Sequence, residues 1–306
     1  MSVGTQETDP GSVRTHPLPA DGFDPRAATP LELRGYGLPQ RPDPAARPGL
    51  TAIWDEVFAR KLSYIRPVLQ PAPGLLHGIE RPRRAVPAVT MNHPFWSGGV
   101  VHATAGQAFG WVTGRWNVPD VTPPADGPGD WYSFAWIGID GTADVTQIGT
   151  VQSVSTNPDG SLSKACYAVC EWWPASWQVI SNFPVSFGDT VSGLICMLSP
   201  TEAEYSMVNS TAGVYTGFRM LTPPGTTTSA ENQAEWILEH PGVKDESAQL
   251  PNFGEIYFDS ALAGYGLEFV ADGGPDTVLN MVEDGVTVAT TTVETPTVIR
   301  IAYTGG

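Results

Sequence analysis

The sequence predicts an all-β fold, an antiparallel sandwich. Of its 306 residues, 33 are glycine and 29 are proline, while only 16% are charged. This composition suits short strands and many turns better than long helices. From Met91 onward, short alternating or apolar runs follow one another at regular spacing, with turn residues between them. Regularly spaced strands without helical interludes are typical of an antiparallel sandwich.

Residues 1–90 form a basic, proline-rich extension that we expect to be mostly irregular. It holds 11 of the 16 Lys and Arg residues, and its proline runs must be extended or turn-like. One helix is expected within Leu50–Leu69, where apolar residues recur at helical spacing, with Thr51 as its N-cap. We expect little hydrophobic core within the extension itself.

The strands of residues 91–306 are bounded by glycine, proline, asparagine and aspartate. Asp284-Gly285 is expected to form a hairpin turn, because this dipeptide tolerates the positive φ values that such turns require. The expected strands are Gly98–Ala103, Ala108–Asn117, Trp131–Ile139, Val145–Ser153, Ala165–Trp172, Thr190–Met197, Glu204–Asn209, Thr216–Leu221, Ala234–Leu238, Gly254–Ser260, Thr277–Glu283, Val286–Thr292 and Val298–Ala302.

Charge is distributed unevenly along the chain. Residues 91–306 hold 5 Lys and Arg against 23 Asp and Glu, a net charge of −18. Nucleic acid is therefore not an expected partner, since phosphate binding needs clustered cations. The acidic balance indicates either a soluble, self-repelling surface or a domain adapted to acid. No apolar run approaches the roughly 18 residues of a membrane span, and the N-terminus has no recognisable signal peptide.

Cysteine and histidine give no metal signature. Cys166 and Cys170 are four residues apart on an expected strand, about 13 Å, which is too far for a disulfide. We expect reduced thiols, although a bridge from Cys196 to one of the other two stays open. The five histidines are scattered and no glycine loop suits a phosphate. The sequence predicts no metal and no cofactor.

The segment Asn232–Glu239 carries the strongest sign of chemistry, because it places a carboxylate, Glu235, in an apolar, aromatic, strand-like run. Such a carboxylate is either structurally paired or chemically used. Serine chemistry would need a positioned Ser–His–acid set, and no Gly-x-Ser-x-Gly elbow is present. The two Asp-Thr/Ser-Gly loops of aspartic peptidases are absent as well. Carboxylate chemistry beside aromatic side chains remains.

Seven motifs follow one another in an informative order. They are Phe95-Trp96-Ser97-Gly98-Gly99, Asn117-Val118-Pro119, Ala135-Trp136-Ile137-Gly138-Ile139-Asp140-Gly141, Gln147-Ile148-Gly149, Glu171-Trp172-Trp173-Pro174, Gly188-Asp189 and Ala234-Glu235-Trp236-Ile237-Leu238-Glu239. Over about residues 92–304 this series resembles the glutamic peptidases, or eqolisins. The resemblance implies a concanavalin-like or jelly-roll-like sandwich of two large, bent sheets, with residues 91–306 as the catalytic domain.

The resemblance also implies a catalytic dyad of Gln147 and Glu235. Glu235 would act as general base on a water molecule and Gln147 would stabilise the oxyanion. The implied enzyme is a metal-independent, pepstatin-insensitive acid endopeptidase, secreted and monomeric, with polypeptides as substrates. The residues that match positions lining the family's cleft or flanking its dyad are Trp96, Trp136, Asp140, Glu171 and Trp173.

Two departures from the family pattern bear on type and specificity. Tyr167-Ala168-Val169 replaces the family's Asp-x-Trp, which puts subsite contacts in question. The loop before Gln147 is short and lacks cysteine, as expected of a bacterial-type member. The basic extension is a candidate propeptide that lies across the acidic cleft at neutral pH, with acid incubation trimming it near residues 80–95.

Two other functions remain open from the residues alone. One is a β-sandwich glycosidase with Glu171 and Glu235 as its carboxylate pair. The other is a non-catalytic carbohydrate-binding sandwich that uses its tryptophans as stacking platforms.

Overall fold

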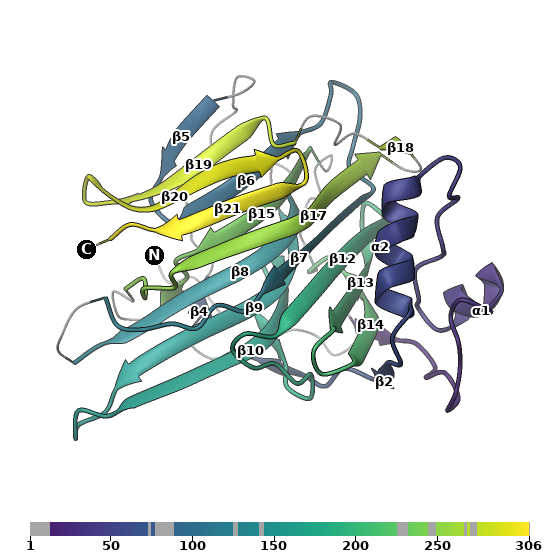
Figure 1. Cartoon of the computed structure of the whole chain (residues 1–306), viewed down its shortest axis with the longest axis horizontal. Coiled ribbons are helices and arrows are strands. Elements are labelled where there is room, and N and C mark those ends of the chain that lie inside the picture. Colours follow the sequence, from purple (N-terminus) through teal and green to yellow (C-terminus); the bar gives the residue numbers. More distant parts are fainter. Residues whose placement is uncertain are drawn as a thin grey trace.

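Strands make up most of the chain in the computed structural model, which confirms the all-β prediction. The structure describes residues 13–72, 75–76, 89–124, 128–140, 144–224, 232–243, 249–265, 268–269 and 274–305. Two antiparallel sheets pack against each other (Figure 1). They share β17 (Glu255–Tyr265), whose first half pairs with β21 in sheet 1 and whose second half pairs with β7 in sheet 2.

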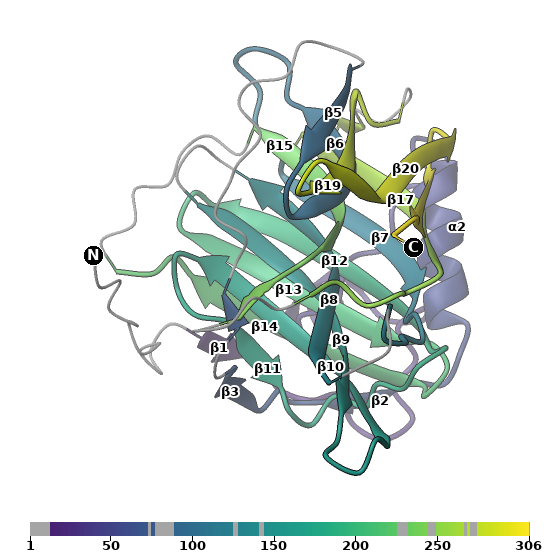
Figure 2. The ribbon, with the colours of Figure 1, turned by 90° about the vertical axis from the view of Figure 1, so that its left-hand side faces the viewer.

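Sheet 1 is the larger sheet, and Figure 2 shows it running from β3 and β11 at one end to β19 and β20 at the other. β5 (Val89–His93) adds to it in parallel beside β19. In spatial order, the other strands are β3 (Leu69–Pro71), β11 (Gln178–Ile180), β10 (Leu162–Trp173), β9 (Val145–Thr156), β8 (Asp130–Asp140), β15 (Gln233–Glu239), β6 (Trp96–His102), β19 (Thr277–Glu283), β20 (Val286–Thr295) and β21 (Val298–Tyr303).

Sheet 2 continues from β17 and ends at β1 and β2, which both pair with β14. Two short pieces complete the structure, a pairing of β4 (Leu75–Leu76) with β16 (Gly242–Val243) and of β18 (Glu268–Phe269) with β17. The strands of sheet 2 are β7 (Trp111–Asn117), β12 (Thr190–Ser199), β13 (Glu202–Asn209), β14 (Val214–Leu221), β1 (Val13–Thr15) and β2 (Ser63–Ile65).

The two faces of sheet 1 bury different clusters. Successive side chains of a strand point to opposite faces, so Ile137 and Ile148 enter the core shared with sheet 2, while Trp136 belongs to a second cluster on the other face. Both faces are covered, which explains the nearly continuous burial along β8, β9 and β15. We call the face that carries Trp136 the site face.

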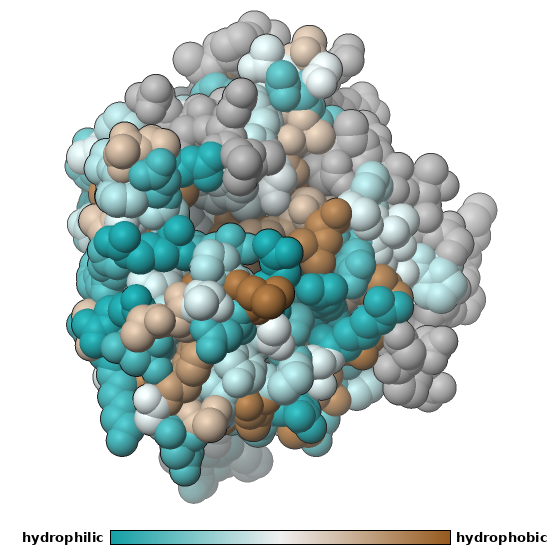
Figure 3. All heavy atoms as spheres, turned by 90° about the vertical axis from the view of Figure 1, so that its right-hand side faces the viewer, coloured by the Kyte–Doolittle hydropathy of each residue, from teal (hydrophilic) through white to brown (hydrophobic). Residues whose placement is uncertain are grey.

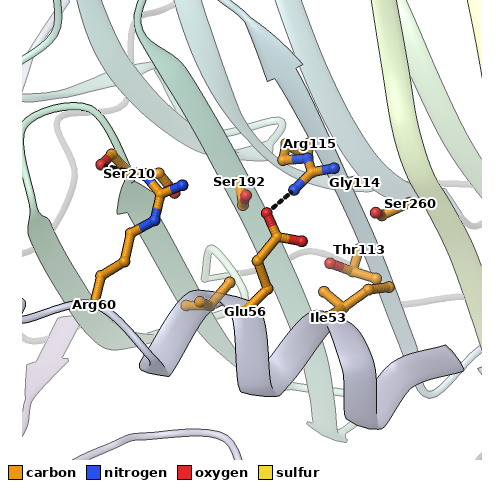
Figure 4. A pocket seen from close by; sticks show the side chains of 10 residues that line it. Ile53, Glu56, Arg60, Thr113, Gly114, Arg115, Ser192, Ser210 and Ser260 are labelled. Atoms are coloured by element: carbon orange, nitrogen blue, oxygen red, sulfur yellow. Dashed lines mark hydrogen bonds and ion pairs between the residues drawn. The ribbon is translucent and has the colours of Figure 1, made fainter. Parts of the chain in front are cut away.

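The N-terminal extension finds its hydrophobic core on sheet 2. It contains α1 (Pro30–Gly35), which the sequence did not predict, and α2 (Pro48–Phe58). Trp54 and Phe58 of α2 are buried in one cluster with Val208 and Tyr215 of sheet 2. Glu56 of α2 also reaches Arg115 of β7 at 2.7 Å (Figure 4). On the side where the helices lie, the surface is mostly hydrophilic, with small, separate apolar patches (Figure 3).

The expected helix within Leu50–Leu69 is shorter than predicted, and Thr51 is not its cap. Arg47 occupies the N-cap position and Pro48 starts the helix, so Thr51 lies one turn inside. Its hydroxyl donates to the Arg47 carbonyl at 2.9 Å. The helix ends at Phe58, and the chain then forms β2, whose backbone pairs with β14. Tertiary pairing therefore overrides the helical spacing of the last residues.

Local turn chemistry was predicted more accurately. Asp284 and Gly285 both adopt positive φ, at 48° and 82°, and they close the hairpin between β19 and β20.

The three cysteines are free. Within the described ranges, no helix is long and apolar enough to cross a membrane.

Candidate functional site

One row of residues crosses the site face of sheet 1. The backbone pairs Glu235 of β15 with Gly138 of β8, Gly138 with Gln147 of β9, and Gln147 with Glu171 of β10. Residues paired across antiparallel strands project to the same face. Gln147 and Glu235 are 88 residues apart in the sequence, yet both project from one face of the sheet. Their strands are separated by β8, so their backbones lie about 10 Å apart.

Gly138 separates the two residues without placing a side chain between them. Any larger residue would project into the gap, because the Cβ of residue 138 points to the site face. A Cβ built there would lie 2.8 Å from Cζ3 of Trp136 and 3.0 Å from the Thr146 carbonyl oxygen. The edge of the Trp136 ring therefore lies close over Gly138, in the region between the Glu235 and Gln147 side chains that we call the gap.

Gln147 is held by the next residue in the row. Its Nε2 donates to Oε2 of Glu171 at 2.5 Å, and both side chains are buried. A hydrogen bond to an ionised carboxylate is about twice as strong as one between neutral groups. This contact fixes the orientation of the amide, with Nε2 toward Glu171, since the nitrogen is the only donor on that side chain.

An aromatic group surrounds the row on the same face. Trp136 contacts Trp96 edge to face at 5.4 Å and stacks on Phe134 at 6.0 Å between ring centroids. Phe134 in turn meets Trp177 edge to face at 4.2 Å. All four rings are buried, so they line the region beside the row and exclude water from it.

The remaining residues implied by the family resemblance lie at the margin of the row. Trp173 follows Glu171 by two positions on β10, hence on the same face, and is only partly buried. The backbone of Asp140 ends β8, where it pairs with Val145 and Gln233; its side chain lies outside what the structure describes. The fold therefore brings the seven implied residues onto neighbouring strands of one sheet.

Sequence reasoning missed one residue of this face, Glu239. It follows Glu235 by four positions on β15, is buried, and accepts a hydrogen bond at Oε2 from Nε1 of Trp136 at 2.9 Å. The sequence does contain a sign of this residue. Side chains alternate between the two faces of a strand, so residues four apart, such as Glu235 and Glu239, project to the same face.

Cysteine nucleophiles do not fit this site. Burial raises the pKa of the Cys170 thiol, which lies on the core side of β10, and the nearby Glu171 carboxylate raises it further. Burial likewise raises the pKa of Cys166 to about 11 and that of Cys196 to about 12. Reactive cysteines need the opposite shift. Among the described residues, no three His, Cys, Asp or Glu side chains are grouped to hold a metal ion.

A surface pocket lies elsewhere, between α2 and sheet 2. Its charged lining includes Arg60 and Arg115, and Figure 4 shows Glu56 bonded to Arg115. Arg115 also donates to Asp259 at 2.7 Å, so its charge is already offset by two carboxylates. None of the residues implied by the resemblance lines this pocket.

Comparison with known proteins agrees with the sandwich and its motifs. The model of the Peptidase A4 family matches residues 94–303. Aspergillopepsin-2 of Aspergillus niger is 27% identical over 218 residues, which cover 65% of this chain and 73% of that protein.

Two solved structures share the fold. The scytalido-glutamic peptidase complex with a transition state analog inhibitor gives a TM-score of 0.56 at 20% identity. SCP-B, an Eqolisin family member in a complex with the tripeptide Ala-Ile-His, gives 0.53 at 18% identity. Each match covers 69% of this chain and 98% of the other. Because the family model spans more than half of the sequence, the chain belongs to the Peptidase A4 family, the glutamic peptidases, and is a peptide hydrolase of the acid endopeptidase class.

Proposed function

We propose that this chain hydrolyses peptide bonds through Gln147 and Glu235. The observation that carries the proposal is the single cross-strand row in which these two side chains flank the side-chain-free Gly138. A peptide carbonyl bound between the two side chains, beside the Trp136 ring edge that covers Gly138, would have a carboxylate on one side and an amide on the other. The glutamic peptidase family supports the same pair.

The proposed reaction is a general-base hydrolysis. Glu235 takes a proton from water as the water oxygen forms a bond to the carbonyl carbon, and the carbonyl π electrons move onto the oxygen. Gln147 donates through Nε2 to this oxyanion. When the C–N bond breaks, Glu235 returns the proton to the leaving nitrogen and becomes a carboxylate again. No metal ion is needed for any step.

Acid operation follows from the choice of base. An imidazole is protonated below about pH 6.5, whereas a carboxylate with an ordinary pKa near 4.3 is still partly ionised, and so able to accept a proton, at about pH 3–4. The composition also suits stability in acid. When the carboxylates of residues 91–306 are protonated, only 5 Lys and Arg residues remain charged there, so repulsion between positive charges is small. We propose secretion as a monomer and a bacterial-type origin on the family resemblance alone.

Latency at neutral pH is part of the proposal. Gln147 and Glu235 are fully buried, so substrate reaches them only after covering chain moves. β3 and β5, which both precede the motif-bearing strands, pair near opposite edges of sheet 1. The sequence between these two strands carries Arg81, Arg83 and Arg84, a basic run that suits attraction to the carboxylates. We propose that acid weakens its attraction to the carboxylates and that cleavage near residues 80–95 opens the site.

The test is hydrolysis of a denatured protein at about pH 3–4, with pepstatin and, separately, with a chelator. We expect activity resistant to both. Glu235→Gln should lower kcat by roughly 10²–10⁴-fold and Gln147→Ala by roughly 10²–10³-fold. Glu294→Gln makes the same chemical change at an exposed position and should leave activity unchanged.

The same assay separates the alternatives. A glycosidase would use Glu171 and Glu235, but Gln147 lies between them in the row and is bonded to Glu171. Release of reducing sugar without proteolysis, or an unimpaired Glu235→Gln variant, would overturn the peptidase dyad.

A further inference from the structure

Glu239 is a second buried carboxylate on the site face that the proposed reaction does not use. It lies four residues after Glu235 along β15, with Trp96 and Phe134 as its backbone partners on the neighbouring strands. Its side chain is fully buried. Burying a carboxylate is costly unless hydrogen bonds offset the loss of water, so its placement among aromatic rings calls for a structural or functional reason.

The contact that Glu239 makes is directional. Oε2 accepts from Nε1 of Trp136 at 2.9 Å. An indole has only this one hydrogen-bond donor. Stacking on Phe134 and the edge contact with Trp96 restrict the tilt of the Trp136 ring, and the bond to Glu239 restricts its rotation in its own plane.

The opposite edge of the same ring lies at the proposed reaction centre. Cζ3 of Trp136 is the atom closest to a Cβ built on Gly138, at 2.8 Å. Gly138 is the residue between Glu235 and Gln147. One rigid indole therefore has its nitrogen on Glu239 and its benzene edge at the boundary of the gap between the two proposed catalytic residues.

We propose that Glu239 is a positioning residue, which sets the width of the gap between Glu235 and Gln147 by holding Trp136. This role rests on the proposed function. Loss of the bond lets the ring rotate into or away from the gap, and a misplacement of about 1 Å at a reaction centre costs roughly 100-fold in rate. The effect should fall on kcat, because Glu239 would act on the reaction through Trp136.

The experiment compares Glu239→Gln, Glu239→Leu and Trp136→Phe with the wild type. Glutamine keeps a carbonyl acceptor for the indole, whereas leucine and phenylalanine each remove one partner. We expect kcat to fall roughly 10–100-fold in Glu239→Leu and in Trp136→Phe, with the KM of Glu239→Leu changed by less than about threefold. Glu239→Gln should keep kcat close to the wild-type value. The double variant with Glu239→Leu and Trp136→Phe should have a kcat no lower than that of either single variant.

A spectroscopic measurement separates positioning from general damage. Among the ten indole N–H resonances, that of Trp136 is assigned by its absence in Trp136→Phe. It should shift in Glu239→Leu and stay near the wild-type position in Glu239→Gln. The Trp236 indole, which donates to the Thr113 carbonyl on the other face of β15, should not move in either variant and so reports an intact fold.

The outcomes are distinct. An unmoved Trp136 resonance, or a Glu239→Leu enzyme as active as the wild type, overturns the positioning role alone. A wild type that hydrolyses no protein overturns the proposed function, and the positioning role with it. A shifted resonance with reduced kcat and rescue by glutamine supports both.

Discussion

The orientation of one amide group decides whether Gln147 can serve as an oxyanion donor. An amide rotated by half a turn would present its oxygen to the oxyanion and repel it. The 2.5 Å hydrogen bond from Nε2 to Glu171 fixes the rotation of the amide, because a carboxylate accepts from the nitrogen only, and an NH2 group has two N–H donors, so this bond and a bond to the oxyanion can coexist. In the proposed reaction, Glu171 would therefore act through Gln147.

Replacing Glu171 tests this orientation. Glu171→Leu should lower kcat roughly 100-fold with little change in KM, because the Gln147 amide loses the partner that orients it. Glu171→Gln can still accept through its Oε1, although more weakly, and should lose roughly 10-fold. Steady-state kinetics on one peptide substrate measures both. Equal losses in the two variants would show that the charge of Glu171, not its bond to Gln147, matters.

Gly138 offers a second test at the residue scale. A Cβ at this position meets the Trp136 ring at 2.8 Å and the Thr146 carbonyl oxygen at 3.0 Å, and the backbone oxygen cannot move aside. Gly138→Ala should destabilise the protein by about 1–3 kcal/mol and lower kcat in the molecules that remain folded. Urea unfolding and kinetics at a temperature well below unfolding measure the two effects.

The matched control is Gly35→Ala, where a new Cβ meets no atom within 4 Å. It should leave activity unchanged and stability close to that of the wild type. A Gly138→Ala enzyme of full activity would mean that the gap over Gly138 is wider than the reaction needs.

At the scale of single elements, α2 is bound by side chains far away in the sequence. The ring centroid of Phe58 lies 4.7 Å from that of Trp54 and 6.2 Å from that of Tyr215 on β14. Phe58→Ala should lower the free energy of unfolding by about 3–5 kcal/mol, measured by urea unfolding. Leu31→Ala is the control, since Leu31 is 76% exposed and its loss should cost less than about 0.5 kcal/mol. Equal effects of the two variants would contradict the packing.

The sequence predicted elements well where the information is local. The Asp-Gly turn formed as expected because two adjacent residues suffice to determine it. The end of α2 at Phe58 was missed because the partner of β2 is β14, about 150 residues away. Glu239 was missed for the same reason, since its meaning depends on Trp136, 103 residues away. The motifs predicted candidate site residues, but not the row in which the strands order Glu235, Gly138, Gln147 and Glu171.

At the scale of the whole molecule, two kinds of contact hold the N-terminal extension on sheet 2. Ion pairs form one kind, such as Arg14 with Glu202 of β13 and Glu56 with Arg115 of β7. Within the extension, the hydrogen bond from Arg41 lowers the pKa of Asp55, so this pair stabilises the extension's own fold above the unfolded-state pKa of Asp55, and its contribution is lost as pH falls through the lower folded-state value. The apolar cluster around Trp54 and Tyr215 is the second kind, and it does not titrate.

This difference gives a prediction about maturation. If acid incubation cuts the chain near residues 80–95, the N-terminal fragment should stay bound to the sandwich, because burial of Trp54 and Phe58 against Val208 and Tyr215 persists at pH 3–4. Size-exclusion chromatography of the acid-treated enzyme should show both fragments in one peak, which a denaturing gel then separates. Phe58→Ala should weaken this association at acid pH more than at neutral pH, where the ion pairs still contribute. An active, trimmed enzyme that elutes without its N-terminal fragment would show instead that the whole extension is a removable propeptide.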